Sequence, residues 1–220
     1  MPDSDMMFEK FMALISPGAP KREVECAKYL AHAGPRLFPR FPHRELTFSF
    51  EERMHFGDSD YIVAGDFKTD VGKIERRVYL WELKAAQCFL MQRDDNNTRL
   101  RPTVDLIKAE TQLIHYATEA KSNEMFCRKF DVRPHNVMMG GIIIGRDERI
   151  WDPEDKRVTQ MDGHLSYDLR REKIYDMTGI AIMTWDRIAD FLKPDVQPKP
   201  SAEKAGSPTS PPPSLAISNT

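Results

Sequence analysis

The sequence predicts an α/β protein in which helices flank a mixed central β-sheet. Some segments carry apolar residues at helical spacing, and others are alternating or continuous apolar runs rich in β-forming residues. Along the chain these segments run as helices, strands, a long helix, two strands and a closing helix, which is the order expected of an α/β sandwich. With 220 residues, of which 40% are hydrophobic, the chain can form one domain with a sizeable core.

Two helices are expected before the first strand. Residues 7–15 form a short amphipathic pattern that stops at the Ser-Pro-Gly-Ala-Pro run of residues 16–20. A second pattern runs from about Lys21 to Ala33, and Gly34-Pro35 is expected to end it. Both helices are predicted to cover a sheet.

Three strands follow these helices. From Glu45, the apolar residues Leu46, Phe48 and Phe50 alternate with polar ones, which is typical of a half-buried strand. Residues 61–64 and 78–81 are apolar runs of β-forming residues joined by a polar stretch around Val71. These two runs are predicted to form an antiparallel hairpin that is buried on both faces.

The rest of the domain is expected to contain one long helix, two strands and a closing helix. The helix runs from about Thr103 to Lys121, with its apolar residues along one side. Residues 137–144 form a nearly continuous apolar run that predicts a central strand, and residues 180–183 predict the last strand. Thr184 is expected to cap a helix that ends at Leu192.

The composition changes at Pro194. Seven of the sixteen prolines lie beyond residue 193, among Ser, Lys and Ala residues that cannot bury enough apolar surface to fold. We therefore expect a single domain over residues 1–193 and a disordered Pro/Ser-rich tail over residues 194–220.

Composition also excludes several functional classes. The net charge of −2 and the isoelectric point near 6.3 exclude an overall basic field, so any contact with nucleic acid must be local. Cys26, Cys88 and Cys127 are isolated, and the six histidines have no paired metal-ligand spacing, so neither disulfides nor a zinc site is expected. No apolar run reaches the ~20 residues of a membrane span and no secretory signal is present, so we expect a cytoplasmic protein without membrane contact.

The residues that carry chemistry lie at the end of the predicted hairpin. Side chains alternate along a strand, so Glu82 and Lys84 project from the same face while Leu83 points to the other. A hairpin centred on Val71 places Asp60 directly opposite Glu82, and opposed residues share a face. Two carboxylates and a lysine are thereby predicted to meet at one end of an apolar sheet.

This group of side chains suggests phosphodiester hydrolysis. Carboxylates buried together need a compensating charge, which Mg²⁺ would supply, and Lys84 could orient a water molecule or stabilise developing charge. The alternative is an ordinary solvated pair at a strand end, because a Glu-x-Lys triplet alone is a weak signal. Asp58 is a rival for Asp60, since both face the same way; Asp60 is favoured because the apolar run begins directly after it.

Three further residues are candidates for supporting roles. Gln112 and Tyr116 lie one turn apart on the long helix and could brace the site, although such a pair is also common on helix surfaces. Arg146 follows an apolar strand and could reach a phosphate, or it could be an ordinary salt-bridge partner. Neighbouring arginines that could follow a DNA backbone, or simply be solvated, are Arg76 with Arg77, Arg99 with Arg101, and Arg170 with Arg171.

The order Asp60, Glu82-x-Lys84 and Gln112-x-x-x-Tyr116 resembles the PD-(D/E)XK nuclease superfamily, and its last pair resembles the exonuclease branch. More closely, residues 20–192 are similar to the nuclease domain of Shedu antiphage defence proteins. The similar stretches run from Trp81 through Gln112 and include residues 141–146 and 182–186.

The resemblance implies a restriction-endonuclease-like core and a DNA nuclease that requires Mg²⁺ or Mn²⁺ and forms a homo-oligomer. It implies that the backbone carbonyl of Leu83 is a further metal ligand and that a glutamate from an early helix joins the site. Glu23 is favoured over Glu25 for this role, because Ala27 and Leu30 follow it at helical spacing. Many Shedu-like proteins have a longer region before the nuclease domain. We therefore expect the regulatory or sensing domain to be missing here or to be supplied by a partner protein.

Two alternative functions stay open at this point. One is a repair or restriction-type nuclease of the same fold, which would use the same residues. The other is a catalytically inactive module for nucleic-acid binding or oligomerisation, against which the intact acidic pair and lysine argue.

Overall fold

The computed structural model describes residues 4–37, 46–54, 57–69, 71–94, 99–152 and 157–193. The tail expected over residues 194–220 lies outside the described residues. Cys26, Cys88 and Cys127 are free thiols, as the sequence predicts. None of the helices in the described ranges has the length and apolar character that crossing a bilayer would require.

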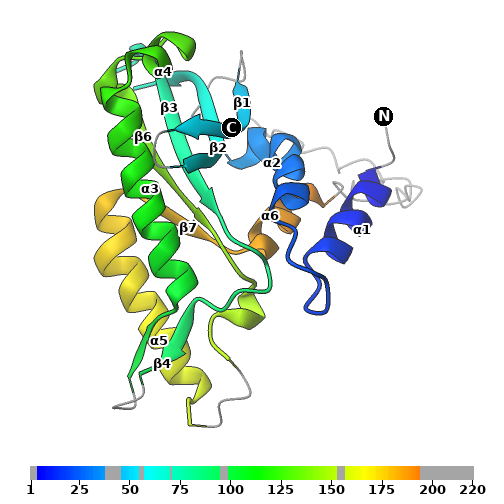
Figure 1. Ribbon diagram of the computed structural model, residues 1–220. Coiled ribbons are helices and arrows are strands. Elements are labelled where there is room, and N and C mark those ends of the chain that lie inside the picture. The colour runs from blue at the N-terminus through cyan, green and yellow to red at the C-terminus, as the bar shows by residue number, and fades with distance from the viewer. Residues whose placement is uncertain are drawn as a thin grey trace, which may run out of the picture.

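A mixed five-stranded sheet forms the centre of the molecule, which confirms the predicted α/β class (Figure 1). The strands stand in the order β1-β2-β3-β6-β7, with the first three antiparallel and the last three parallel. Their bounds are β1 Thr47–Met54, β2 Gly57–Lys68, β3 Ile74–Leu83, β6 Val137–Ile143 and β7 Ala181–Met183. A separate small hairpin pairs β4 (Met91–Arg93) with β5 (Leu100–Pro102).

The hairpin of β2 and β3 has the predicted register. Its pairs run from Lys68 with Ile74 to Tyr61 with Trp81, so the turn is centred on Val71 and the next opposed positions are Asp60 and Glu82. Strand β2 begins earlier than predicted, at Gly57, because backbone pairing with β1 extends beyond its buried apolar part. Both Asp58 and Asp60 therefore lie inside the strand, and the expectation that the strand begins after Asp60 was wrong.

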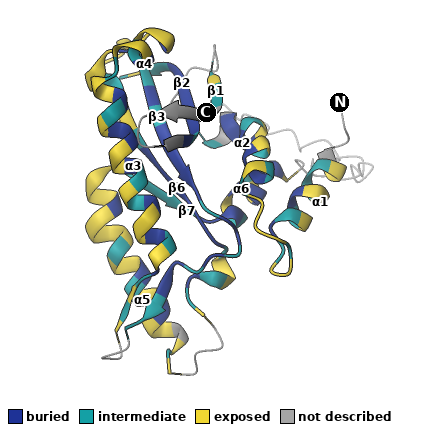
Figure 2. Ribbon diagram, in the orientation of Figure 1, coloured by how far each residue is buried: buried dark blue, intermediate teal, exposed yellow. Residues whose placement is uncertain are grey.

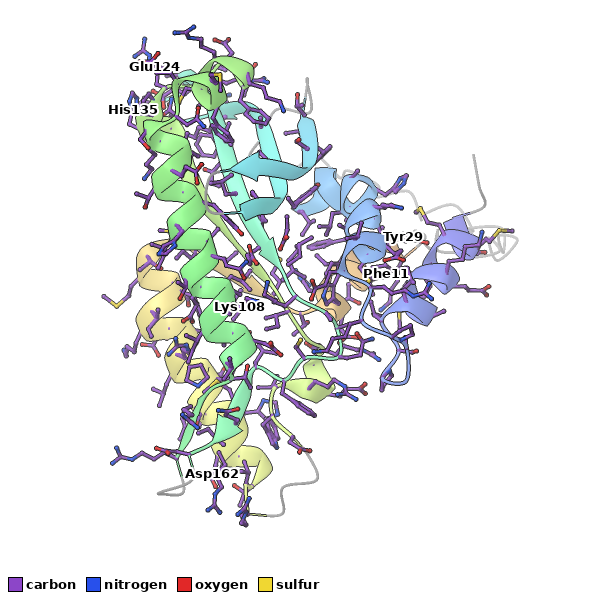
Figure 3. The ribbon with its side chains drawn as sticks, viewed as in Figure 1. Phe11, Tyr29, Lys108, Glu124, His135 and Asp162 are labelled. Atoms are coloured by element: carbon purple, nitrogen blue, oxygen red, sulfur yellow. The ribbon has the colours of Figure 1, made fainter. Side chains whose placement is uncertain are left out.

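Helices cover both faces of this sheet. On one face lie α3 (Val104–Ser122), α4 (Glu124–Lys129) and α5 (Gln160–Arg170); on the other lie α1 (Ser4–Leu14), α2 (Glu23–Leu37) and α6 (Trp185–Leu192) (Figure 1). Figure 3 shows Phe11 of α1 directed toward Tyr29 of α2, and their ring centroids are 5.1 Å apart. Three layers result, with the sheet in the middle.

Side-chain alternation divides the core into two parts. Ile62 and Leu80 pack on the α3 face, whereas Tyr61 and Trp81 pack on the face covered by α1, α2 and α6. The strands are buried through much of their length, and the helices expose their outer sides (Figure 2). Because alternation continues along each strand, Asp60 and Glu82 belong to the α3 face.

The long helix α3 confirms its prediction. Thr103 is its N-cap and accepts a hydrogen bond from the backbone N–H of Leu106. The buried side of the helix consists of Leu106, Ala109, Leu113, Tyr116, Ala117 and Ala120. This apolar stripe packs α3 on the sheet and fixes which of its side chains face β3.

Several boundaries differ from the predictions. Helix α2 continues through Gly34 and Pro35, because Gly34 serves close packing: a Cβ there would lie 2.5 Å from the Phe48 ring. Pro35 lacks the backbone N–H that a residue inside a helix donates. Thr184 occupies the N-cap position of α6, but its hydroxyl donates to Asp147 Oδ1 at 2.7 Å and does not cap the helix.

Helix α5 and the π-helical turn that follows it over Arg171–Asp176 were not predicted from the sequence. Much of the apolar character of α5 is on its exposed side, where Met161 is 76% exposed and Leu165 is 53% exposed. The sequence pattern of apolar residues on one buried side, which predicts a helix that covers a core, is therefore weak in this segment. Helix α4 has only six residues, too few for a periodic pattern to stand out.

Candidate active site

The predicted site residues meet at the end of β3, beside the first part of β2. Glu82 lies one residue before the end of β3, and Lys84 directly follows it. The backbone N–H of Lys84 donates to the Ile143 carbonyl at 2.8 Å, which continues the pairing of β3 with β6. From β2, Asp60 Oδ2 accepts a hydrogen bond of 2.8 Å from the backbone N–H of Leu83. Asp60 thus reaches across to the residue between Glu82 and Lys84.

Glu82 is a fully buried acid. Its residue is 0% exposed, and its Oε1 accepts from Lys84 Nζ at 2.5 Å. Its Oε2 is buried and has no hydrogen-bond partner among the described residues. Lys84 Nζ also lies 3.3 Å from the Leu83 carbonyl oxygen. One ammonium group therefore serves two of the predicted metal ligands and leaves one carboxylate oxygen unmatched.

Burial makes both carboxyl groups harder to ionise. Burial, together with the negative charge of Asp60, raises the pKa of Glu82 to about 8. Burial also raises the pKa of Asp60, although the Leu83 N–H and the charge of Lys84 oppose the rise. Burial alone would lower the pKa of Lys84, but the charges of Glu82 and Asp60 outweigh it and raise the pKa. The site thus holds a charged lysine beside two acids that compete for it.

Two residues from the opposite layer hold the peptide bond that follows Lys84. The Lys84 carbonyl accepts a hydrogen bond of 2.7 Å from Trp185 Nε1, and the Ala85 N–H donates to Glu23 Oε1 at 2.8 Å. Glu23 is the first residue of α2 and Trp185 is the first residue of α6. Together with the bond to Ile143, these contacts fix the main chain on both sides of Lys84, and hence the direction of its side chain.

The packing of α2 and α6 explains why these residues reach the strand end. Trp185 is 0% exposed and packs with Phe11 of α1 at a ring-centroid distance of 6.1 Å. Ala27 and Leu30 of α2 are buried in the same cluster, so the start of α2 is held toward the sheet. Of the two glutamates weighed from the sequence, Glu23 is the one that the structure brings to Ala85.

Gln112 and Tyr116 approach the site from the α3 side. Gln112 Nε2 donates to the Tyr116 hydroxyl oxygen at 3.2 Å, and Gln112 Oε1 is buried without a partner among the described residues. Burial raises the pKa of Tyr116, and the negative charges of Glu82 and Asp60 raise it further. The charges of both acids therefore act on Tyr116.

Arg146 has a different environment. Its guanidinium donates to Asp186 through Nη2 at 2.8 Å and through Nε at 3.2 Å, and Nη1 lies 3.2 Å from Glu148. The Asp186 hydrogen bonds raise the pKa of Arg146. Arg146 thus ties the end of β6 to the start of α6, which is the salt-bridge alternative considered from the sequence. We leave it out of the proposed site.

The remaining candidates from the sequence are Asp58 and the arginine pairs. The backbone of Asp58 pairs with Arg53 of β1, and its side chain lies outside the described part of the structure. The described arginine pairs do not form one patch. Arg101 in β5 precedes the start of α3, whereas Arg76 donates to the Phe130 carbonyl beyond its far end. Helix α3 has 19 residues, which corresponds to about 28 Å.

Sequence reasoning missed the contribution of Trp185. It lies within the stretch of residues 182–186 that resembles the Shedu nuclease domain, but its partner, the Lys84 carbonyl, is 101 residues away.

Gly140 and Gly141 allow close packing on strand β6. A Cβ at Gly140 would lie 2.4 Å from Trp81 Nε1, so these glycines let the Trp81 ring lie against β6.

The oxygen donors at this site fit a hard divalent cation. Asp60, Glu82 and the Leu83 carbonyl provide oxygen ligands, which Mg²⁺ and Mn²⁺ prefer, and the unmatched Glu82 Oε2 is one such donor. Within the described ranges, no group of three or more His, Cys, Asp or Glu side chains is arranged to hold a metal. A metal here would therefore depend on two carboxylates, a backbone carbonyl and water.

Comparisons of the chain with models of protein families, with curated proteins and with solved structures gave no match.

Proposed function

We propose that this protein is a divalent-metal-dependent DNA nuclease with a PD-(D/E)XK core, related to the nuclease domain of Shedu antiphage defence proteins. One observation carries the proposal: Asp60, Glu82 and Lys84 converge at the end of β3, and Glu82 is fully buried there. The motif order that resembles the superfamily thus corresponds to a compact group of side chains.

The energetics support a catalytic role over a structural one. A buried ion pair seldom stabilises a fold more than apolar residues of the same volume would, because both charges lose their hydration. Here burial, together with the negative charge of a second acid, Asp60, raises the pKa of Glu82 to about 8. Charges kept in such a position are typical of sites that bind a cation or a reacting group.

In the proposed site, Asp60, Glu82 and the Leu83 carbonyl hold Mg²⁺ or Mn²⁺. The bound metal would supply Lewis acidity toward a phosphodiester and lower the pKa of water. Lys84 stays protonated beside Glu82 and places its positive charge where the phosphate gains negative charge, or orients the attacking water. Glu23 and Trp185 hold the main chain of Lys84, so that its ammonium group has a defined position.

Gln112 and Tyr116 complete the proposed site on the α3 side. Gln112 Oε1 is free to accept a hydrogen bond from water or from a group of the substrate. The Tyr116 hydroxyl accepts from Gln112 and keeps its own proton to donate. The choice of DNA as substrate, the role in antiphage defence and assembly as a homo-oligomer rest on the resemblance to Shedu proteins.

Cleavage assays test this proposal directly. Purified protein would be incubated with linear and with closed circular DNA in Mg²⁺, in Mn²⁺ or in EDTA, with Glu82→Gln as the inactive control. We expect metal-dependent degradation that Glu82→Gln abolishes; cutting of circular DNA would indicate internal cleavage. DNA binding without cleavage in either metal would contradict the proposal and favour an inactive binding module.

A further inference from the structure

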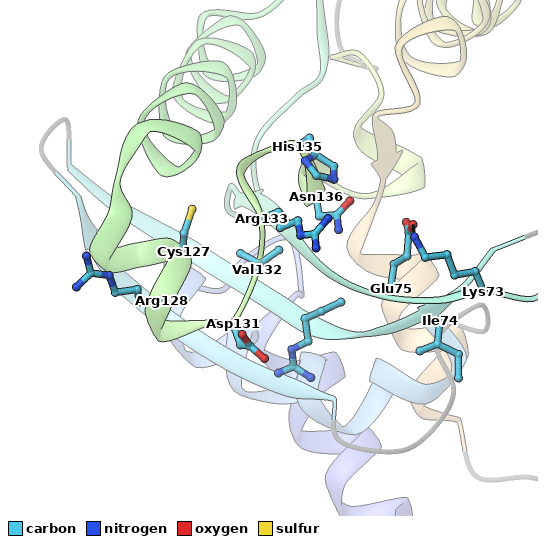
Figure 4. A pocket seen from close by; sticks show the side chains of 11 residues that line it. Lys73, Ile74, Glu75, Cys127, Arg128, Asp131, Val132, Arg133, His135 and Asn136 are labelled. Carbon is cyan, nitrogen blue, oxygen red and sulfur yellow. Dashed lines mark hydrogen bonds and ion pairs between the residues drawn. The ribbon is translucent and has the colours of Figure 1, made fainter.

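A cavity of about 470 Å³ lies at the end of β3 opposite the proposed active site. It is bounded by the start of β3, the end of α4 and the loop of residues 131–136 that leads into β6 (Figure 4). Figure 4 shows side chains from these segments around a common space, with Arg133 and Asn136 on the loop side and Glu75 on the β3 side.

The cavity carries excess positive charge. Four of the side chains that line it are cationic and two are acidic. Of the acids, Glu75 is already matched by Lys73 at 3.0 Å and by Arg77 at 3.4 Å, and these contacts lower its pKa. The guanidinium of Arg133 makes no ion pair or side-chain hydrogen bond with any described residue, so its donors are available to a ligand.

Arg76 adds a second guanidinium, and its contacts within the protein leave it able to bind a ligand. Its Nε donates to the Phe130 carbonyl at 3.2 Å, and its Nη1 lies 3.6 Å from Asp66 Oδ1. The carbonyl contact positions the group, while the carboxylate is beyond the distance of a strong charge-assisted hydrogen bond. Arg76 and Arg133 therefore both present planar arrays of donors, which match phosphate oxygens in geometry and charge.

The loop that forms the cavity wall is held in shape. Asp131 has a left-handed backbone with φ of 50°, and its N–H donates to the Arg128 carbonyl at 3.2 Å. Arg133 precedes Pro134 and has the extended backbone that proline imposes on its neighbour, with φ of −82° and ψ of 149°. The Asn136 N–H then donates to the Arg133 carbonyl at 2.9 Å. Little ordering of the main chain is needed before a ligand binds.

We propose that this cavity binds a small molecule that carries phosphate groups and has about the size of a nucleotide. Its volume lies in the range of ligand pockets, roughly 300–1,000 Å³, which exceeds the space that one phosphate fills. Asn136 and His135 can bond polar groups of the organic part, and Asp131 can accept from hydroxyls.

This site is separate from the proposed active site. Arg76 and Glu82 both lie in β3, six residues apart, which corresponds to about 20 Å along the strand. The ligand would thus bind without touching Asp60, Glu82 or Lys84. The inference does not depend on nuclease activity, and the test below uses neither DNA as substrate nor a divalent metal.

Calorimetric titration would compare ATP, inorganic tripolyphosphate and adenosine as probes, in buffer without divalent metal. We expect ATP and tripolyphosphate to bind and adenosine not to bind. Arg133→Gln should weaken ATP binding about tenfold or more, because it removes a charged donor from the phosphates. Arg171→Gln is the matched control: Arg171 is an exposed arginine that pairs with Asp168 on α5, and its loss should leave ATP affinity unchanged.

Several results would overturn the inference. They are the absence of binding by both phosphate probes, equal binding of adenosine and ATP, and an unchanged ATP affinity in Arg133→Gln. Displacement of ATP by a short DNA duplex whose own binding also needs Arg133 would overturn it too, because the cavity would then belong to a DNA path. Equal melting temperatures of wild type and Arg133→Gln would show that the variant folds. Lys73→Gln should also weaken ATP binding.

Discussion

The two ends of strand β3 carry charges in opposite environments. Near its start, Lys73, Glu75 and Arg77 pair with one another at or near the surface, where water solvates them and each pair contributes little to stability. Near its end, Glu82 is buried beside Asp60, and its pKa is raised to about 8. Charges buried in this way do not stabilise the fold. They are suited to binding a cation or a phosphate.

The largest effects are expected from the two acids at the buried end. Asp60→Asn and Glu82→Gln should each abolish metal-dependent cleavage and reduce Mn²⁺ affinity, because an amide keeps the size of the carboxylate but not its charge. Calorimetric titration with Mn²⁺ beside a cleavage assay would measure both. Asp58→Asn is the control; if it loses both properties while Asp60→Asn keeps them, the metal ligand has been placed two residues too far along.

Lys84→Ala should reduce cleavage about 10²–10³-fold while DNA binding and melting temperature stay close to wild type. The ammonium group is expected to act on charge that develops during the reaction, so its loss should appear in the rate and not in binding. As a control, Lys121→Ala removes an exposed lysine in the last turn of α3 and should not slow cleavage. Wild-type rates in Lys84→Ala would contradict the proposed site.

Glu23 distinguishes positioning from metal binding. If Glu23 acts by accepting the Ala85 N–H, Glu23→Gln keeps an acceptor oxygen and should retain most activity. Glu23→Ala loses the acceptor and should lower the cleavage rate about tenfold, with unchanged Mn²⁺ affinity. Equal loss of activity and of Mn²⁺ affinity in both variants would instead make Glu23 a metal ligand, as the resemblance implies for a glutamate from an early helix.

Glu82 should also make the stability of the protein in EDTA depend on pH. The pKa of Glu82 rises from 4.5 to about 8 on folding, so between these values the folded state holds a proton that the unfolded state has released. This contribution is complete below pH 4.5 and is lost as the pH rises through 8. Glu82→Gln should therefore make the loss of stability shallower over that interval, as measured by urea unfolding at several pH values.

Glu75, at the other end of β3, is a control because its pKa is shifted in the opposite direction. Its contacts with Lys73 and Arg77 lower its pKa, so its contribution is present above its ordinary value and is lost as the pH falls. Glu75→Gln should leave the slope between pH 4.5 and 8 as it is in wild type. An identical slope in Glu82→Gln and wild type would show that Glu82 ionises normally in the folded chain.

The sequence by itself determined the α/β class, the hairpin register and the shared face of Asp60, Glu82 and Lys84. These follow from local rules: side chains alternate along a strand, and a turn centred on Val71 sets which residues are opposed. The buried stripe of α3 was predictable for the same reason, since its apolar residues repeat at helical spacing.

Only the tertiary structure decided which elements cover the site and hold it. Glu23 reaches Ala85 over a separation of 62 residues, and Trp185 reaches Lys84 over 101 residues. Arg146 follows a strand, yet it binds Asp186 at the start of α6 and not the site. Periodicity tells which face a side chain occupies, but the partner on that face depends on how helices from distant parts of the chain pack on the sheet, because hydrogen bonds join neighbours in space whatever their separation in sequence.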